Sequence, residues 1–271
     1  MRTHETELAR FTALANATRC SDSLGFHALE APLRRLATTE VLAPVINQEL
    51  RRIAADRDYA NAAWDASGML LVGGIGWQLR LGVYDRTPAY IYTLPFDLIL
   101  AVVGPVDLEV ERFRRSDTDN SRVQPRGVAR LSPGTTLRLS ASEDAVAVPC
   151  EHRVVVLKLT SALRDPLQRA YCRKTHRLVQ AIAADPMHSD LVSMARALGA
   201  MRRTSASASL RRLAGHDAHF VRWAAMQALA RVRGRRAMER LVAATSDPHP
   251  EVRNGAQRAV AMLEASSKDR C

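Results

Sequence analysis

Two tyrosines and a small set of polar side chains are the residues of this sequence best suited to chemistry. Tyr90 and Tyr92 lie two positions apart in a run of strand-forming residues, so their side chains point to one face. If that face is an interior, two phenols enter one cavity; the alternative is ordinary core filling with hydroxyls at the rim. The further candidates for the same interior are Asp97 and a ligand-binding set of Trp77, Arg138, Cys150 and His152.

Cys150 and His152 share one face of a short segment, Pro149–His152. A thiol beside an imidazole could form a nucleophilic pair or half of a soft-metal site. The alternative is a surface cysteine and histidine near the start of a strand. The four cysteines of the chain are widely spaced and form no CxxC, so we expect reduced thiols.

The other histidines of interest lie in the C-terminal part of the chain. His216 and His219 flank Asp217, and His249 follows Asp247, so each group could resemble a metal cluster. Both groups fall in turns of a repeat, whose polarity explains them more simply. We therefore assign no metal and no cofactor. The sequence also lacks a P-loop, a dinucleotide fingerprint, a GxSxG elbow and an HExxH motif.

The spacing of apolar residues changes along the chain, and it predicts the elements that must position these candidate residues. Residues 5–64 have helical spacing of apolar side chains, whereas residues 69–159 contain about nine short apolar runs separated by glycine and proline turns. In one run Leu108 and Val110 alternate with Glu109 and Glu111, which is typical of a half-exposed antiparallel strand. This region predicts an all-β sandwich or barrel.

From about residue 161 the period is helical again and an internal repeat is present. Val221-Arg222 aligns with Val252-Arg253 at an offset of 31 residues, and Asp185-Pro186 matches Asp247-Pro248 two offsets apart. The unit is helix, turn, helix. These residues resemble HEAT-like repeats over about residues 185–265, and we expect the Asp to cap a helix and to pair with Arg across repeats.

The strand region resembles the cupin family, whose first motif is G-x5-H-x-H-x4-E-x6-G. Tyr90, Tyr92, Asp97 and Gly104 fill that spacing here, and Leu137 stands where the second motif has its histidine. The resemblance implies a double-stranded jelly roll with a concave interior. The positions that hold a metal in the family lack imidazole, so we expect none of the iron, nickel or zinc that cupins carry.

The sequence thus predicts an α+β multidomain protein. Residues 1–64 form an N-terminal helical segment, residues 65–160 a cupin-like jelly-roll barrel, and residues 161–271 an α-helical HEAT-like repeat domain.

Three functions compete for this architecture. The first is a barrel that binds a small organic ligand or substrate, in one version as a metal-independent enzyme. In that enzyme Asp97 would act as base, Tyr90 or Tyr92 as hydrogen-bond donor to a developing oxyanion, and Arg138 as anchor for an acidic substrate. The second is a non-catalytic scaffold that binds a protein partner through the repeats. The resemblance to cupins, which commonly pair through their sheets, also makes a homodimer plausible.

The third function is weak, phosphate-directed binding of nucleic acid. Residues 163–271 hold 20 of the 39 basic and 9 of the 28 acidic side chains, which accounts for the whole net charge of +11. Phe220 and Trp223 are the only aromatic residues among the repeats, so base stacking is lacking and we rank this function last. The candidate contacts are Arg202, Arg203, Arg211, Arg212, Arg231, Arg233, Arg235 and Arg236. No apolar run approaches the roughly 20 residues of a membrane span, and we expect a cytoplasmic protein.

Overall fold

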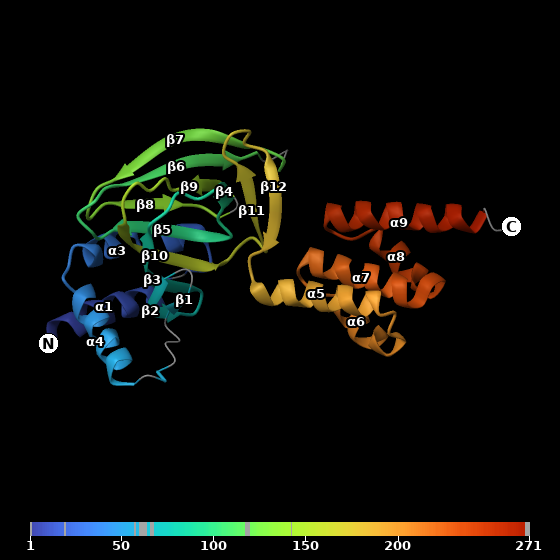
Figure 1. The fold of residues 1–271 in the computed structure, drawn as a ribbon, viewed down its shortest axis with the longest axis horizontal. Coiled ribbons are helices and arrows are strands. Elements are labelled where there is room, and N and C mark those ends of the chain that lie inside the picture. Colours follow the sequence, from blue (N-terminus) through green and yellow to red (C-terminus); the bar gives the residue numbers. More distant parts are fainter. Residues whose placement is uncertain are drawn as a thin grey trace. The chain divides into compact units, whose positions relative to one another are not determined.

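The computed structural model describes residues 2–18, 20–56, 58–59, 64–65, 68–116, 120–141 and 143–268. The chain forms two compact units, Met1–Ile182 and Ala183–Cys271 (Figure 1). The first unit combines helices with two antiparallel sheets and the second is helical, which confirms the predicted α+β class. None of the helices in the described ranges is long and apolar enough to cross a membrane.

Two six-stranded sheets build the first unit. In spatial order the first sheet contains β1 (Trp64–Asp65), β2 (Gly68–Gly74), β3 (Trp77–Tyr84), β10 (Val154–Leu163), β5 (Phe96–Val102) and β8 (Thr136–Leu139). The second contains β12 (Leu178–Ala183), β11 (Leu167–Cys172), β4 (Tyr90–Thr93), β9 (Asp144–Ala147), β6 (Leu108–Arg115) and β7 (Val123–Leu131). The orders β3-β10-β5-β8 and β4-β9-β6-β7 are those of an eight-stranded jelly roll, as predicted.

Strand alternation creates the core between the sheets. On β6, Leu108 and Val110 are fully buried while Glu109 is exposed, as the alternation predicts. These side chains join a cluster that draws on both sheets. Its buried members are Leu94, Leu98, Leu100, Val102, Leu108, Val110, Leu131, Leu139, Val148, Val154 and Val156. The cluster therefore defines which face of each strand points into the sandwich.

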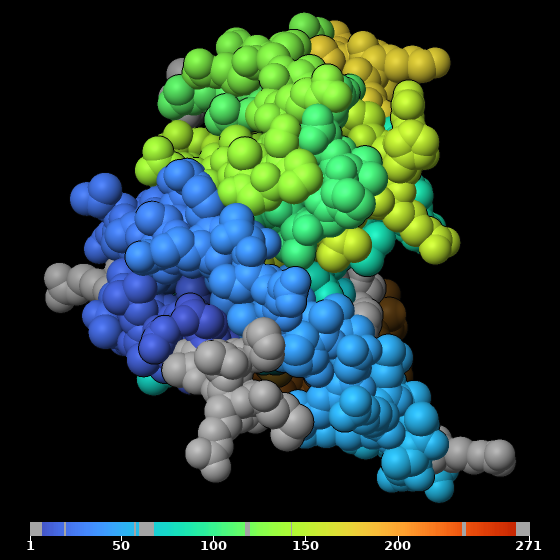
Figure 2. Space-filling model, turned by 90° about the vertical axis from the view of Figure 1, so that its left-hand side faces the viewer, coloured from blue at the N-terminus to red at the C-terminus, as the bar shows by residue number. Residues whose placement is uncertain are grey.

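Helices cover the opposite face of the first sheet. They are α1 (Arg2–Ala17), α2 (Ser23–His27), α3 (Glu30–Ala37) and α4 (Leu42–Ala55). Phe26 and Leu33 are completely buried and share one cluster with Leu79 and Leu157 of the sheet. Figure 2 shows these helices, in blue, lying against the strands, in green. The helical segment predicted at the N-terminus is thus a layer of the first unit.

The segment after residue 160 corrects one prediction. We expected helices from about residue 161, but β10 continues to Leu163, β11 and β12 follow, and the first helix begins only at Pro186. β11 pairs with β4, matching Tyr171 with Ile91, and both side chains are fully buried. Without β11, β4 would be an unpaired edge strand of the second sheet. This requirement arises between distant segments, so it cannot be read from the local sequence pattern.

The second unit consists of stacked helical repeats. Its helices are α5 (Pro186–Ala200), α6 (Ser207–Leu213), α7 (His219–Arg233), α8 (Met238–Ala244) and α9 (Pro250–Lys268), with short 3₁₀ turns at Thr204–Ala206 and Gly234–Ala237. Val221 and Val252 are both completely buried, as their repeat positions predict. A Cβ on Gly199 would lie 2.9 Å from the Ala228 Cα, so small residues allow α5 and α7 to approach closely.

An ion pair joins successive repeats. The Arg222 guanidinium donates from Nη2 and Nε to the two carboxylate oxygens of Asp247, at 2.8 and 3.0 Å. Asp247 also accepts from the His249 backbone N–H at 2.8 Å. Burial would raise the pKa of Asp247, but Arg222 and the His249 N–H outweigh it and lower the pKa. The predicted pairing of Asp and Arg across repeats is confirmed.

Replacing Val252 with Asp should destabilise the repeats by several kcal/mol, because it buries a charge without a partner. The matched control is Val242→Asp, since Val242 is 49% exposed on α8, and we expect it to stay within about 0.5 kcal/mol of the wild type. Urea unfolding followed by circular dichroism measures both. Equal stability of the two variants would contradict the observed packing of α9.

Candidate functional site

Tyr90 and Tyr92 lie together on one face of β4. Their rings contact edge to face, with centroids 6.2 Å apart. Tyr92 pairs with Val146 of β9, whose side chain packs against the core between the sheets. Because paired residues of antiparallel strands point to the same side, both tyrosines face the first sheet.

Asp97 lies on the other side of the sandwich, which corrects the expectation that it shares an interior with the tyrosines. On β5 it has the same phase as Ile99, which packs under the N-terminal helices. Its carboxylate is completely buried and accepts from Ser23 Oγ at 2.8 Å and from Arg164 Nε at 3.2 Å. The Ala141 backbone N–H donates to the second carboxylate oxygen at 2.9 Å. The structure thus makes Asp97 a link between helix and sheet.

Trp77 and Arg138 also lie on the helix side rather than in a shared interior. Trp77 is 2% exposed, packs edge to face on Phe11, and donates from Nε1 to Asn16 Oδ1 at 3.1 Å. Arg138 pairs with Glu30 of α3 at 3.2 Å. These two residues, like Asp97, attach the helical layer to the first sheet. Leu137 lies on the opposite face of β8 from Arg138 and packs against the core between the sheets. It therefore does not share a site with Asp97.

Cys150 and His152 line one cleft of about 590 Å³ beside β6 and β7. Cys150 is partly buried and His152 is exposed. Burial raises the pKa of the Cys150 thiol, and the carboxylate of Asp85 raises it further. The thiol is therefore protonated near neutral pH, which disfavours a nucleophilic role.

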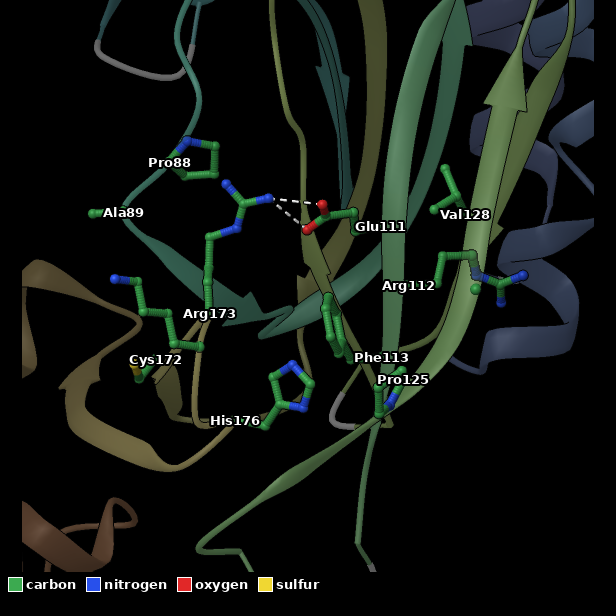
Figure 3. Close-up of a pocket in the computed structure, with 12 residues that line it drawn as sticks. Pro88, Ala89, Glu111, Arg112, Phe113, Pro125, Val128, Cys172, Arg173 and His176 are labelled. Atoms are coloured by element: carbon green, nitrogen blue, oxygen red, sulfur yellow. Dashed lines mark hydrogen bonds and ion pairs between the residues drawn. The ribbon is translucent and has the colours of Figure 1, made fainter.

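A second cleft, of about 740 Å³, lies on the outer face of the second sheet (Figure 3). Glu111 and Phe113 line it, and they point away from the side of β6 that carries Leu108 and Val110. The remaining walls come from residues 88–89 before β4, from Pro125, Gly127 and Val128 of β7, and from the turn of the β11–β12 hairpin. Sequence reasoning missed this cleft because it assigned the hairpin to a helical region.

The turn of the hairpin carries most of the polar groups of this cleft. Arg173 reaches across it, and its Nη2 donates to both carboxylate oxygens of Glu111 at 2.7 Å (Figure 3). The ring of His176 packs edge to face on Phe113, with centroids 5.3 Å apart. His176 adopts φ 56°, a left-handed conformation that is uncommon outside glycine. Its carbonyl accepts from the Val123 N–H at 3.1 Å, which fastens the turn to β7.

Two cations, Arg173 and Lys174, line this cleft against a single acid, Glu111. Arg112 also borders it, but its side chain has the phase of Val110 and its guanidinium lies 3.7 Å from the carboxylate of Asp144. Hydrogen bonds from the Thr175 hydroxyl and from the backbone N–H groups of Thr175 and Lys174 lower the pKa of Cys172. The same groups that stabilise a thiolate also favour other anions. The arrangement can therefore hold a carboxylate or a phosphate beside an aromatic wall.

Comparison with family models identifies repeats in the C-terminal part of the chain. Residues 175–261 match the family model for HEAT repeats, which supports the predicted repeats. No curated protein matches the chain. Among solved structures, a hydroquinone 1,2-dioxygenase in complex with Cd²⁺ and 4-hydroxybenzonitrile is 14% identical, with a TM-score of 0.31, over 38% of this chain and 68% of that one.

Two further solved structures show the same degree of similarity. The hydroquinone 1,2-dioxygenase from Sphingomonas sp. TTNP3 with bound 4-hydroxybenzoate is 12% identical, with a TM-score of 0.30, over 38% of this chain and 70% of that one. Ectoine synthase from P. lautus is 11% identical, with a TM-score of 0.28, over 40% of this chain and 74% of its own. The cupin-like assignment of the fold rests on the strand order described above.

Asp97→Asn should lower the free energy of unfolding by about 3–5 kcal/mol, because it leaves the partly buried Arg164 without its counter-charge. The matched control is Asp107→Asn, which breaks a surface pair in which Arg130 is 69% exposed. That variant should cost less than about 1 kcal/mol. Chemical denaturation of both variants checks the prediction, and similar losses would mean that Asp97 is not a structural link.

Proposed function

We propose that the jelly-roll unit binds a small organic anion in the cleft between Glu111 and Arg173. The observation that carries this proposal is the combination of one aromatic wall with cations that face a single carboxylate. Ligand sites are typically concave and largely apolar, with a few polar groups that fix orientation. This cleft has that composition.

The ion pair across the cleft indicates which ligand group it would take. The Arg173 and Glu111 side chains are 28% and 30% exposed, so an incoming ligand can reach both. A ligand carboxylate offers Arg173 the same two oxygens that Glu111 now supplies. Lys174 lines the same wall and adds a second positive charge. The ligand would therefore replace Glu111 as the partner of Arg173.

The apolar wall fits the body of such a ligand. Phe113 is buried at the base of the cleft, and Pro88, Pro125 and Val128 line its sides. Val128 is 61% exposed, so a flat ring laid over it would remove apolar surface from water. An aromatic carboxylate combines both features. The predicted Tyr and Asp acid–base mechanism forms no part of this proposal, because Asp97 lies on the opposite side of the sandwich from Tyr90 and Tyr92.

Calorimetric titration with benzoate, using benzamide as the neutral comparison, tests the proposal. Arg173→Gln should weaken benzoate binding about 10- to 100-fold, because it removes a charge-assisted contact. Glu111→Gln should strengthen it severalfold, because it removes the internal competitor. The matched control is Arg86→Gln, since Arg86 is 87% exposed and lies outside the cleft.

The opposite responses of the two cleft variants make the test specific. A general loss of fold would weaken binding in both, and a surface charge effect would appear in Arg86→Gln as well. Equal affinity for benzoate and benzamide, or weaker binding to Glu111→Gln, would contradict the proposed anion site.

The HEAT-like repeats support a second candidate function, binding of a protein partner. Met187, Met194 and Met201 follow one another at seven-residue intervals along and just after α5, and each is more than half exposed. This spacing places them on one side of the helix. Flexible methionine side chains are common on surfaces that bind partners.

Replacing Met194 with Glu should abolish such binding while leaving the fold intact, because the side chain is 60% exposed. Val242→Glu, a comparable change on α8, serves as the control. Affinity capture from the native host compares the three proteins. A partner retained by Met194→Glu as well as by the wild type would contradict a role for this stripe.

A further inference from the structure

Two histidines and a glutamate from successive repeats meet at one edge of the helical unit. His219 begins α7, His249 immediately precedes α9, and Glu251 lies in the first turn of α9. One ligand atom from each residue lies within 4.8 Å of the other two. The sequence pattern favoured repeat polarity as the explanation of the turn histidines, and it gave no reason to associate these three residues.

The three side chains are close enough to share a cation once the rings rearrange. The imidazole rings of His219 and His249 stack with centroids 3.4 Å apart and planes inclined by 10°. A metal lies in the plane of each imidazole that binds it, so one ring must turn out of this stack when the ion binds. His219 Nε2 lies 3.5 Å from Glu251 Oε2. The His219 side chain is 9% exposed, whereas that of Glu251 is 70% exposed. The group is therefore closed on the protein side and open toward water.

The repeat scaffold fixes the turn that carries one of the ligands. Asp247 accepts from the His249 N–H, and its own carbonyl accepts from Arg253 Nη1 at 2.8 Å. The Arg222 pair described above holds the same Asp247 against the preceding repeat. These contacts fix the backbone of the turn, so only side chains need to move when a cation binds.

We propose that His219, His249 and Glu251 bind a divalent transition ion such as zinc. Two imidazole nitrogens and one carboxylate oxygen suit zinc and its neighbours, whereas magnesium and calcium prefer all-oxygen sites. Water would complete the coordination on the open side.

Two local features limit the affinity of this site. His249 Nδ1 accepts from the Glu251 N–H at 3.3 Å, so binding of a metal through Nε2 would move the ring proton to Nδ1 and break that long hydrogen bond. The N-termini of α7 and α9 also carry partial positive charge. We therefore expect micromolar rather than tighter binding.

Zinc titration of the full, metal-stripped chain tests the proposal by calorimetry. The wild type should bind one zinc ion at this site, and His249→Ala should weaken that binding at least about tenfold. Glu251→Gln should weaken it while keeping the backbone N–H that contacts His249. The matched control is His152→Ala, which removes an exposed histidine of the other unit and should leave zinc binding unchanged.

Two further measurements keep the test independent of folding and of the cysteines. At the same zinc concentration, the thermal midpoint of the wild type should rise more than that of Glu251→Gln, because stabilisation by a ligand that binds the folded state grows with its affinity. The cobalt-substituted protein should show visible bands without the intense near-ultraviolet absorption of a cobalt–thiolate bond.

Either of two results would overturn the site. One is zinc binding that persists at full affinity in both His249→Ala and Glu251→Gln. The other is binding that is lost in His152→Ala and accompanied by a thiolate signal, which would place the metal at Cys150 and His152.

Discussion

A single buried carboxylate, that of Asp97, connects the parts of the first unit. Arg164 donates to it and also to the carbonyls of Cys20 and Ser21, which lie between α1 and α2. Because Arg164 directly follows β10 and precedes β11, this contact fixes the helical layer and the start of the added hairpin together. A buried charge needs such partners, since desolvation costs several kcal/mol unless hydrogen bonds and counter-charge offset it.

The second unit also depends on an ion pair between an aspartate and an arginine. Its repeats are too small to bury their apolar faces alone, so each depends on its neighbour. The Asp247–Arg222 pair fixes that neighbour's position, and a Cβ on Gly255 would lie 2.7 Å from the ring of Trp223, which limits how bulky the facing residues can be. In both units an arginine from one element and an aspartate from another decide how apolar surfaces meet.

The sequence could predict what depends on local periodicity. Alternation identified the strand that carries Leu108 and Val110, and the 31-residue offset placed Val221 and Val252 in equivalent buried positions. The sequence could not predict contacts between distant segments. Asp97 has the spacing of a cupin ligand but the phase of Ile99, and only the position of the helices shows which face is interior. His219 aligns with Pro250 rather than with His249, so repeat comparison alone cannot bring the two imidazoles together.

The position of the candidate cleft follows from the same packing constraints. Leucine and valine side chains fill the described core between the sheets, so this part of the sandwich contributes to the stability of the fold. The β11–β12 hairpin adds a wall to the outer face of the second sheet instead, and from its turn Arg173 reaches Glu111 of β6. The strands then hold Glu111 and Phe113 opposite a turn that is itself fixed, by the ring of His176 on Phe113 and by its carbonyl on Val123. Under the proposed function, the groups that would meet a ligand therefore lie on the outer face of the second sheet and on this turn, apart from the leucine and valine core between the sheets.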